Sequence, residues 1–488
     1  MSAFNVGILG HVDSGKTTLA ESISTFGSTS AFDKTAKTDL RANTVELGIS
    51  AVDVDGARIS LIDCPGHATL IRAVLAASTV FDAAIIVINA VRGIEVQTVE
   101  HLLLASILCP KHVGIVVNKI DLAPNNKVDI LCRKLPKILE DIGISADSPI
   151  IRTSMRAPVS AESMEAAKAL LIKLHYHPER QTTGNFIMSV DHCFPIKGKG
   201  VVMTGTVTDG SIKIGSMVHI PALEQTRKVK EIQCWKKSVE VTQMGERAAL
   251  LFHDLSPKEI DRTVICSPNA LTKTVKLFGT VKLIRQFRSQ LKSRCRLQLT
   301  VGFESSTVEC QFLKLYPKED NPNEMEYELC DTLDSEKCDH VRLTLEHPVY
   351  TRLGTMYLAA KLDIQKPLEC RLAFHGTVKG INETAEPEIF RRKYKQGSVE
   401  RVEDDYSVIC KGLFKKESDF SIFTGMIVNL STGERGLIAG SFGKQGKCRL
   451  RIDDKLEADT IAKVQNGEEV IVTLRLKQYQ NPKRLVAY

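Results

Sequence analysis

One stretch near the N-terminus, GHVDSGKT from Gly10 to Thr17, constrains this chain more than any other feature. It fits the pattern GxxxxGK[ST] and lies between an apolar run, Val6–Leu9, and a stretch with helical periodicity, Lys16–Ser24. Glycines there let backbone N–H groups surround phosphates, and the positive end of the following helix points at them. Lys16 is placed to contact the β- and γ-phosphates and the Thr17 hydroxyl to bind Mg²⁺. The stretch therefore predicts a phosphate-binding loop for a nucleoside triphosphate.

A second motif, DCPGH over residues 63–67, follows the predicted strand Arg58–Ile62. A carboxylate at this end of a strand, opposite the phosphate loop, can hold Mg²⁺ through water, which is the role we predict for Asp63. Gly66 lets its backbone N–H approach the γ-phosphate. The second motif thus predicts the metal side of the same site.

A third motif, NKID over residues 118–121, ends the predicted strand Val113–Val117. Asp121 can accept both hydrogen bonds from the edge of guanine, while Asn118 supports the base and Lys119 covers its face. Adenine lacks those two donors and would leave a buried carboxylate unpaired, so the base preference should be strong. The three motifs, in this order and spacing, predict a GTPase.

The first 178 residues alternate between strand and helix patterns, which predicts a doubly wound, mostly parallel sheet with helices on both faces. The predicted strands are Val6–Leu9, Arg58–Ile62, Ala83–Ile88, Val113–Val117 and Pro149–Ile151, and the predicted helices are Lys16–Ser24, Gln97–Leu108, Val128–Ile142 and Ala161–Tyr176. After a linker at residues 178–184, short β-rich runs closed by Gly or Pro take over, which is typical of antiparallel barrels.

The expected organisation is an α/β nucleotide-binding domain, two antiparallel β-barrels and a C-terminal β-rich domain. Breaks near Ser267 and between Ile381 and Arg391 give expected domains at 1–178, 183–268, 272–378 and 390–488. Residues 317–339 are acidic and poor in apolar side chains, so we expect a surface loop there. In the last domain we expect strands at Val399–Leu413, Met426–Leu430, Cys448–Ile452 and Glu469–Leu476.

Composition narrows the functional classes. The 488 residues are 43% hydrophobic and 25% charged, which is typical of globular proteins, and the apolar runs are too short to span a bilayer. The 13 cysteines form no CxxC pair and are expected to be buried thiols of a reducing, cytoplasmic compartment. The formal net charge of +7 is concentrated in the last 99 residues, which hold 19 Lys and Arg against 13 Asp and Glu. A basic terminal module on a neutral body favours contact with RNA or another polyanion.

GHVDSGKTT, DCPGH and NKID together resemble the translational GTPase family that includes elongation factor Tu. The resemblance implies that His67 positions the attacking water and that Thr44 completes the Mg²⁺ shell with Thr17 and Asp63. Asn43 departs from the family's isoleucine beside the catalytic histidine, which puts the timing of hydrolysis in question. The implied GTP-binding residues are Asp13, Ser14, Gly15, Lys16, Thr17, Thr18, Asp63, Gly66, Asn118, Lys119, Asp121 and Ser154.

Within that family, the sequence is most similar to the eukaryotic selenocysteine-specific elongation factors. The similarity lies in MSVDHCF at residues 188–194, CRLAFHG at residues 370–376, and the stretch 399–417. It implies a monomer that carries selenocysteyl-tRNA to the ribosome in the GTP state and works with a SECIS-binding protein and SECIS RNA. It also implies a selenocysteine pocket formed by Asp191, His192 and Arg247.

Three other functions remain open at this stage. Another tRNA carrier, of the elongation factor Tu kind or an initiator-tRNA carrier, would have the same first three domains but lack the last 99 residues. A metabolic regulatory GTPase that never binds RNA would explain the first domain but not the basic tail. The C-terminal domain is expected to contact the tRNA and the SECIS complex and is thus the feature that favours the selenocysteine-specific factors.

Overall fold

The structure is a computed structural model in which the described residues are 3–26, 48–54, 56–65, 80–156, 158–255, 263–319, 321–334, 336–363, 369–443, 446–480 and 482–488. The chain forms two compact units. The first comprises Met1–Gln290, Arg294–Cys310 and Leu343–Glu383, and the second comprises Leu291–Ser293, Gln311–Arg342 and Thr384–Tyr488. Each unit is described by itself below.

The first unit begins with a six-stranded sheet in the order β2-β3-β1-β4-β5-β6. Its strands are β1 (Phe4–Gly10), β2 (Gly48–Val54), β3 (Ala57–Asp63), β4 (Ala83–Asn89), β5 (Val113–Asn118) and β6 (Ile150–Arg152). All neighbours are parallel except β2, which pairs antiparallel with β3 at the edge. The strand β2 was not predicted, because its apolar residues alternate with polar ones and it has no continuous apolar run.

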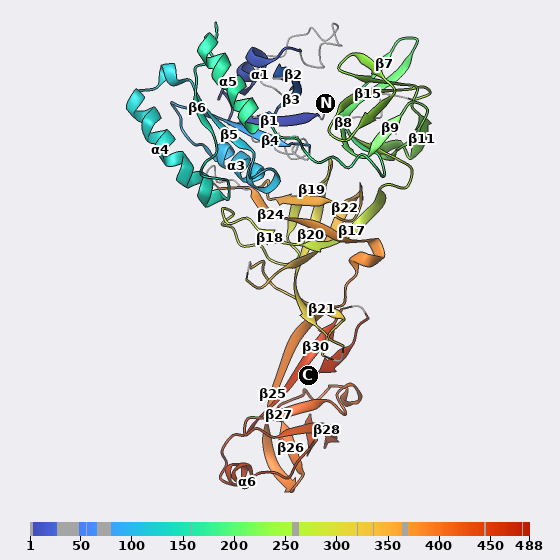
Figure 1. Cartoon of the computed structure of the whole chain (residues 1–488). Helices are drawn as coiled ribbons and strands as arrows, with labels where there is room; N and C mark the ends of the chain where they lie inside the picture. Colours follow the sequence, from blue (N-terminus) through green and yellow to red (C-terminus); the bar gives the residue numbers. More distant parts are fainter. Residues whose placement is uncertain are drawn as a thin grey trace. The chain divides into compact units, whose positions relative to one another are not determined.

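Helices cover both faces of this sheet (Figure 1), as the alternating pattern predicted. The helices are α1 (Lys16–Ile23), α3 (Val96–Leu108), α4 (Asn125–Ile142) and α5 (Ala161–Leu174), with a short 3₁₀ helix, η3, at Ile120–Leu122. One apolar core joins α1 and α5 to the sheet, and a second core joins α3 and α4 to its other face. The phosphate loop thus lies between the end of β1 and the start of α1.

Residues 187–266 of the first unit form an antiparallel β domain, called here the first β domain. Its strands are β7 (Ile187–Ile196), β8 (Gly200–Asp209), β9 (Ser211–Lys213), β10 (Met217–Ile220), β11 (Gln225–Lys228), β12 (Glu231–Cys234), β13 (Lys237–Val239), β14 (Val241–Gln243), β15 (Arg247–Phe252) and β16 (Thr263–Cys266). Eight of them follow the order β11-β10-β16-β7-β8-β15-β12-β13, and β9 pairs with β14. Alternating apolar residues of these strands fill one core.

The following strands form a closed barrel in which β19-β23-β24-β17-β22-β20 returns to β19. They are β17 (Thr272–Thr280), β18 (Lys282–Leu283), β19 (Arg296–Val301), β20 (Glu304–Pro317), β22 (His340–Thr351), β23 (Met356–Ala360) and β24 (Leu372–Ile381). Closure of the barrel leaves no free sheet edge, which is the usual solution for short antiparallel strands.

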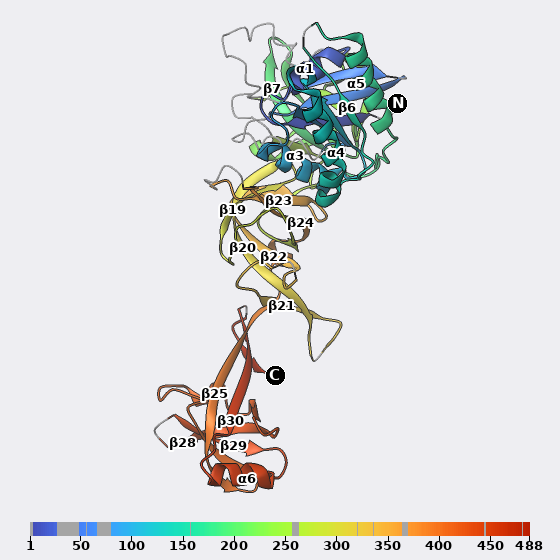
Figure 2. The same ribbon diagram turned by 90° about the vertical axis from the view of Figure 1, so that its left-hand side faces the viewer.

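The second unit contains a further closed barrel, in which β25-β26-β29-β28-β27-β30 returns to β25. Its elements are β21 (Met325–Leu329), β25 (Ile389–Asp404), β26 (Ser407–Lys411), β27 (Ile427–Leu430), β28 (Arg435–Phe442), β29 (Lys447–Ile452), β30 (Ile471–Tyr479), β31 (Leu485–Ala487) and the helix α6 (Ala458–Gln465). Figure 2 shows α6 against one end of this barrel. The architecture predicted from the sequence, a β-rich C-terminal domain, is confirmed.

Two expectations about this unit are wrong in detail. The acidic stretch 317–339 is not entirely a surface loop, because it contains β21, whose Glu326 is 1% exposed and accepts a hydrogen bond from Lys477 Nζ at 2.8 Å. The expected single strand Val399–Leu413 is a hairpin, since β25 ends at Asp404 and β26 begins at Ser407.

Among the helices of the described residues, none is long and apolar enough to cross a membrane.

Candidate functional site

The phosphate loop takes backbone conformations that require its glycines. Gly10, the last residue of β1, has φ +143°, and a Cβ there would lie 2.3 Å from the carbonyl oxygen of Val87. Gly15 has φ +96° just before α1, and a Cβ there would lie 2.2 Å from Asn118 Nδ2. Both positions combine a left-handed backbone with a close approach, so the loop can curl only with glycine. The loop predicted from the motif is therefore present as a tight turn into a helix.

The charged groups of the loop meet at the start of α1. Lys16 Nζ donates to the carbonyl oxygen of His11 at 2.7 Å, and burial lowers the pKa of Lys16. Thr17 Oγ1 donates to Asp63 Oδ2 at 2.6 Å, so the two predicted Mg²⁺ ligands lie side by side. Burial raises the pKa of Asp63, although the hydrogen bond from Thr17 opposes it.

Asp63 Oδ1 is buried and has no hydrogen-bond partner among the described residues. A buried carboxylate oxygen without a donor is costly unless a cation or a water completes it. Together with the adjacent Thr17 hydroxyl, this oxygen offers the all-oxygen environment that Mg²⁺ prefers. The residues at this position therefore fit the predicted metal.

Asn118, at the end of β5, joins the phosphate loop to the loop after β6. Its Nδ2 donates to the carbonyl oxygen of Ser14 at 2.9 Å, and its Oδ1 accepts from the backbone N–H of Met155 at 3.0 Å. Ser154 Oγ donates to Asp121 Oδ1 at 2.6 Å. The structure thus places Ser154, one of the predicted GTP-binding residues, beside Asp121 of the NKID motif.

Some of the remaining predicted residues of the nucleotide site are described by the structure, and the others are not. Asp13 is exposed with φ +59°, and Thr18 is exposed on α1. Lys119 has φ +62° and precedes η3. The predicted catalytic His67 and the residues Gly66, Thr44 and Asn43 lie outside the described residues.

Two residues of α3 that the sequence analysis did not predict make long-range contacts, and one of them contacts the phosphate loop. His101 is fully buried, and its Nδ1 accepts the backbone N–H of Gly10 at 2.9 Å. Burial lowers the pKa of His101 to about 3, so the ring is neutral. Glu100 accepts two hydrogen bonds of 2.9 Å from Arg371, one from its backbone N–H and one from its Nε. The only sequence signal was a charged pair within an apolar helix.

The three residues predicted to form a selenocysteine pocket lie in the first β domain. Pairing between β7 and β8 shifts register between Val190 and His192, which places Asp191 in a β-bulge. Such a bulge turns consecutive side chains toward one site. Arg247, the first residue of β15, reaches the same carboxylate, so the structure brings all three predicted residues together.

Asp191 is surrounded by donors. Arg247 donates to both carboxylate oxygens, from Nη1 at 2.5 Å and from Nη2 at 3.0 Å, and Thr204 Oγ1 donates at 2.9 Å. His192 Nδ1 lies 2.9 Å from Asp191 Oδ1. Burial alone would raise the pKa of Asp191, but the Arg247 guanidinium holds it well below its usual range. Thr204 is a member of this cluster that the sequence analysis missed.

This geometry changes the expected electrostatics of the pocket. The side chain of Arg247 is 4% exposed, and its charge is balanced by Asp191. The imidazole of His192 is the more accessible group, with 32% of its side chain exposed. A positive charge offered to a ligand by this cluster therefore depends on His192 together with the Asp191–Arg247 pair.

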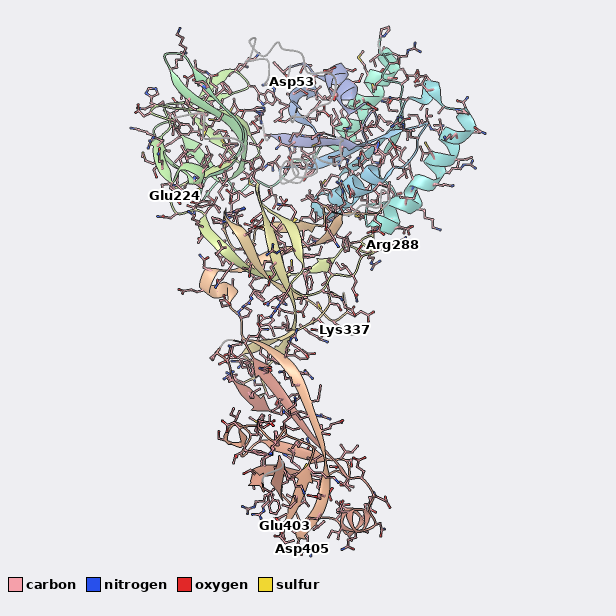
Figure 3. The ribbon with its side chains drawn as sticks, turned by 180° about the vertical axis from the view of Figure 1, so that it is seen from behind. Asp53, Glu224, Arg288, Lys337, Glu403 and Asp405 are labelled. Carbon is pink, nitrogen blue, oxygen red and sulfur yellow. The ribbon has the colours of Figure 1, made fainter. Side chains whose placement is uncertain are left out.

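Several basic residues of the C-terminal barrel are paired within their own unit. Arg391 contacts Asp331 at 3.0 Å, and Arg392 contacts Glu328 at 3.1 Å. Figure 3 labels Glu403, which accepts a hydrogen bond from Arg449 Nε at 2.7 Å. The exposed Lys415 and Lys416 have no ion pair with any residue that the structure describes. The net charge of this unit thus offers fewer free cations than the sequence suggested.

Comparisons with known proteins agree with this arrangement. The family model described as the elongation factor Tu GTP binding domain matches residues 1–190, and that of the eEFSec C-terminal RIFT domain matches residues 386–481. The chain is 34% identical to the selenocysteine-specific elongation factor of Mus musculus, over 93% of this chain and 89% of that protein. It is 29% identical to the selenocysteine-specific elongation factor of Methanocaldococcus jannaschii, over 98% of each chain.

Solved structures give the same result for the fold. The translation elongation factor SelB of Methanococcus maripaludis, in complex with the GTP analogue GppNHp, matches with a TM-score of 0.77 and 26% identity, over 100% of this chain and 99% of that one. The predicted fold class is thereby confirmed: a GTP-binding α/β domain followed by antiparallel β domains. From its identity and coverage with the mouse protein, the chain belongs to the family of selenocysteine-specific elongation factors.

Proposed function

We propose that this chain binds selenocysteyl-tRNA in its GTP-bound state, delivers it to the ribosome at recoded UGA codons and hydrolyses GTP. The observation that carries the proposal is that one compact unit holds both the guanine-nucleotide motifs and the Asp191–His192–Arg247 cluster. The other tRNA carriers and the metabolic GTPase are not favoured, since relatives that match over nine-tenths of the chain are selenocysteine-specific factors.

Each motif of the nucleotide site has a role in this proposal. Backbone N–H groups of residues 13–18 and the Lys16 ammonium bind the phosphates, and Asp121 with Ser154 binds the base. Thr17 and Asp63, together with Thr44, would hold Mg²⁺, which neutralises charge on the phosphate oxygens when bound. His67 would orient the attacking water.

The pocket in the first β domain would distinguish selenocysteine from serine by charge. A selenol ionises more easily than a hydroxyl, so at neutral pH the selenocysteyl side chain is an anion and the seryl side chain is neutral. The Asp191 carboxylate fixes the ring of His192 and the guanidinium of Arg247, so their N–H groups are oriented before a ligand arrives. An anion gains from this orientation, whereas a neutral hydroxyl gains far less.

Residues 390–488 would supply the contact that restricts delivery to selected messages. We assign them to the tRNA and the SECIS complex, residues 183–268 to the aminoacyl end and residues 272–378 to the body of the tRNA. The exposed Lys415 and Lys416 are adjacent cations of this unit that could meet phosphates. The factor would act as a monomer in the cytoplasm.

The central experiment is GTP-dependent binding of three ligands: selenocysteyl-tRNA, seryl-tRNA and uncharged tRNA. We expect tight binding of the first only, and only with GTP. Equal affinity for selenocysteyl- and seryl-tRNA would contradict the charge-based pocket. Absence of tRNA binding, with GTP hydrolysis intact, would instead support a regulatory GTPase.

Two variants extend the test. His67→Ala should leave GTP affinity intact and slow hydrolysis by about two orders of magnitude. Replacing Lys415 and Lys416 by alanine should weaken recoding and reduce the salt dependence of RNA binding. Point variants suit this unit better than deletion, since Lys477 and Tyr479 cover the buried Glu326.

A further inference from the structure

In the linker between α5 and β7, the side chain of Arg180 forms hydrogen bonds with the N-terminal domain. Its Nη2 donates to the carbonyl oxygen of Ala3 at 2.8 Å and to Asp82 Oδ2 at 2.6 Å. The Arg180 and Asp82 side chains are 13% and 7% exposed. Burial raises the pKa of Asp82, even with Arg180 beside it. Replacing a pair this buried by well-packed apolar residues often costs little stability, so its presence calls for another explanation.

Asp82 extends this contact to the start of β1 and from there to the first β domain. Its Oδ2 also accepts the backbone N–H of Asn5 at 2.8 Å. The side-chain Nδ2 of Asn5 in turn donates to the carbonyl oxygen of Gly245 at 3.0 Å. Asn5 is 1% exposed, so water does not compete for this bond. We call Asn5, Asp82 and Arg180 the latch.

Gly245 is the residue of the first β domain that contacts the latch. It has φ +90°, and a Cβ at this position would lie 2.7 to 2.8 Å from the guanidinium atoms of Arg180. Its backbone N–H donates to the carbonyl oxygen of Val207 at 2.8 Å, which fixes the turn into β15. Because Arg247 begins β15 two residues later, the latch ends beside the strand that carries the pocket.

We propose that the latch is a positioning site, which holds the aminoacyl pocket at a fixed place relative to the nucleotide. This inference rests on the proposed function. The positioning role follows from the path of two strands. The strand β1 begins at the latch and ends at the phosphate loop, and β15 begins beside the latch with Arg247. No latch residue belongs to the nucleotide motifs or to the Asp191 cluster.

Loosening the latch should therefore lower the fraction of molecules in which the aminoacyl pocket lies in its binding-competent position relative to the nucleotide. Apparent affinity falls in proportion to that fraction, whichever amino acid the tRNA carries. This consequence separates the latch from the pocket, because a defect in the pocket changes the preference between amino acids.

The first test is Asp82→Asn in the full chain. We expect affinity for selenocysteyl-tRNA and for seryl-tRNA to fall by the same factor, about tenfold, with GTP affinity within about twofold of wild type. Asp129→Asn is the matched control, since it also removes a carboxylate paired with an arginine, Arg152, but on the exposed side of the N-terminal domain. This control should leave both tRNA affinities unchanged.

The second test acts from the other side of the latch. Gly245→Ala introduces a methyl group against the Arg180 guanidinium and should reproduce the effect of Asp82→Asn. Gly215→Ala is its control, because Gly215 has a similar φ of +88° in the same β domain but only Lys228 Cε near its Cβ, at 3.6 Å. The comparison removes the contribution of backbone strain.

A third measurement reports geometry without tRNA. The single tryptophan, Trp235, lies in the first β domain between β12 and β13, so energy transfer from it to a mant-labelled GTP analogue measures the separation between the two domains. The latch variants should broaden the distribution of transfer lifetimes, and the controls should not.

Three outcomes would overturn the latch. They are unchanged lifetimes and tRNA affinities in Asp82→Asn and Gly245→Ala, equal effects in the two controls, or a loss confined to selenocysteyl-tRNA, which would place these residues in the pocket itself. Failure of the proposed function has a different signature. The wild-type protein would not prefer selenocysteyl-tRNA, while the lifetimes would still respond to the latch variants.

Discussion

The nucleotide site and the aminoacyl pocket differ in how completely their buried carboxylates are hydrogen-bonded. Around the phosphate loop, Asp63 Oδ1, Ser14 Oγ and Thr153 Oγ1 are buried without a partner among the described residues. In the pocket, the Asp191 carboxylate receives bonds from Arg247 and Thr204 and lies against His192. We therefore expect the first site to be completed by its ligand and the second to be organised before its ligand arrives.

The difference has an energetic consequence. A group that is incomplete in the protein alone contributes to ligand binding more than to folding. A group that is already paired contributes to both, because its removal leaves a buried partner uncompensated. Substitutions in the two sites should therefore separate ligand affinity from stability, and the following predictions test that separation.

The largest effect on stability is expected from Arg247→Ala. The change leaves the buried Asp191 carboxylate without its main counter-charge, which costs about 3–5 kcal/mol for a buried pair. Chemical unfolding followed by the fluorescence of Trp235, which lies in the same β domain, measures the loss. The double variant Asp191→Asn/Arg247→Ala should recover part of it, because no charge is then left unpaired. A single variant as stable as wild type would show that the pocket is not preorganised.

The positions of the described nucleotide-motif residues in the fold could be predicted from sequence alone because each motif is local. The phosphate loop, DCPGH and NKID each place their groups within a few residues of a strand end, and a parallel sheet brings those ends to one edge. His101 and Glu100 were missed, because their partners Gly10 and Arg371 lie 91 and 271 residues away in the chain. No local pattern marks such contacts.

Asp121→Asn should have the next largest effect, this time on ligand choice. An amide cannot accept both hydrogen bonds from guanine, so we expect GTP affinity to fall by about 100-fold and preference to move toward xanthosine triphosphate. Competition binding with the two nucleotides measures the change. Stability without nucleotide should stay within about 0.5 kcal/mol of wild type, since Asp121 is exposed and its carboxylate accepts a hydrogen bond from the nearby Ser154. Unchanged GTP affinity would place the guanine site elsewhere.

A smaller effect is expected from Asp63→Asn, which should raise, not lower, the stability of the nucleotide-free protein. Burial disfavours the ionised form of this carboxyl, as its raised pKa shows, so a neutral amide should increase the stability of the nucleotide-free protein by up to about 1 kcal/mol. The same change should weaken Mg²⁺-dependent GTP binding about tenfold, and EDTA should then have little further effect. A variant that is less stable and binds Mg²⁺ normally would contradict the role of Asp63 as a metal-side ligand.

The C-terminal barrel shows where charge counting from sequence is insufficient. Its positive excess is real, but Arg391, Arg392 and Arg449 are paired with acidic residues, some of them from the stretch 317–339 that was expected to be a loop. Net charge is a sum over the whole surface, whereas RNA binding depends on cations that remain unpaired. The pairing depends on tertiary contacts between β21 and β25, which no local pattern in either strand predicts.

The smallest predicted effect concerns acid stability and tests whether the link between α3 and the phosphate loop is already complete without nucleotide. His101 has a pKa of about 3 in the folded chain and about 6.5 when unfolded, so between these values the unfolded chain binds more protons. Stability is therefore fully present above pH 6.5 and falls as the pH drops, by about 1 kcal/mol between pH 6.5 and 5.5 for this one group. His101→Gln removes the titration, and His253→Gln, at an exposed position, is the matched control. Unfolding curves at a series of pH values should show a shallower acid loss in His101→Gln only. Parallel curves for all three proteins would mean that His101 is protonated in the folded chain and does not accept the Gly10 N–H.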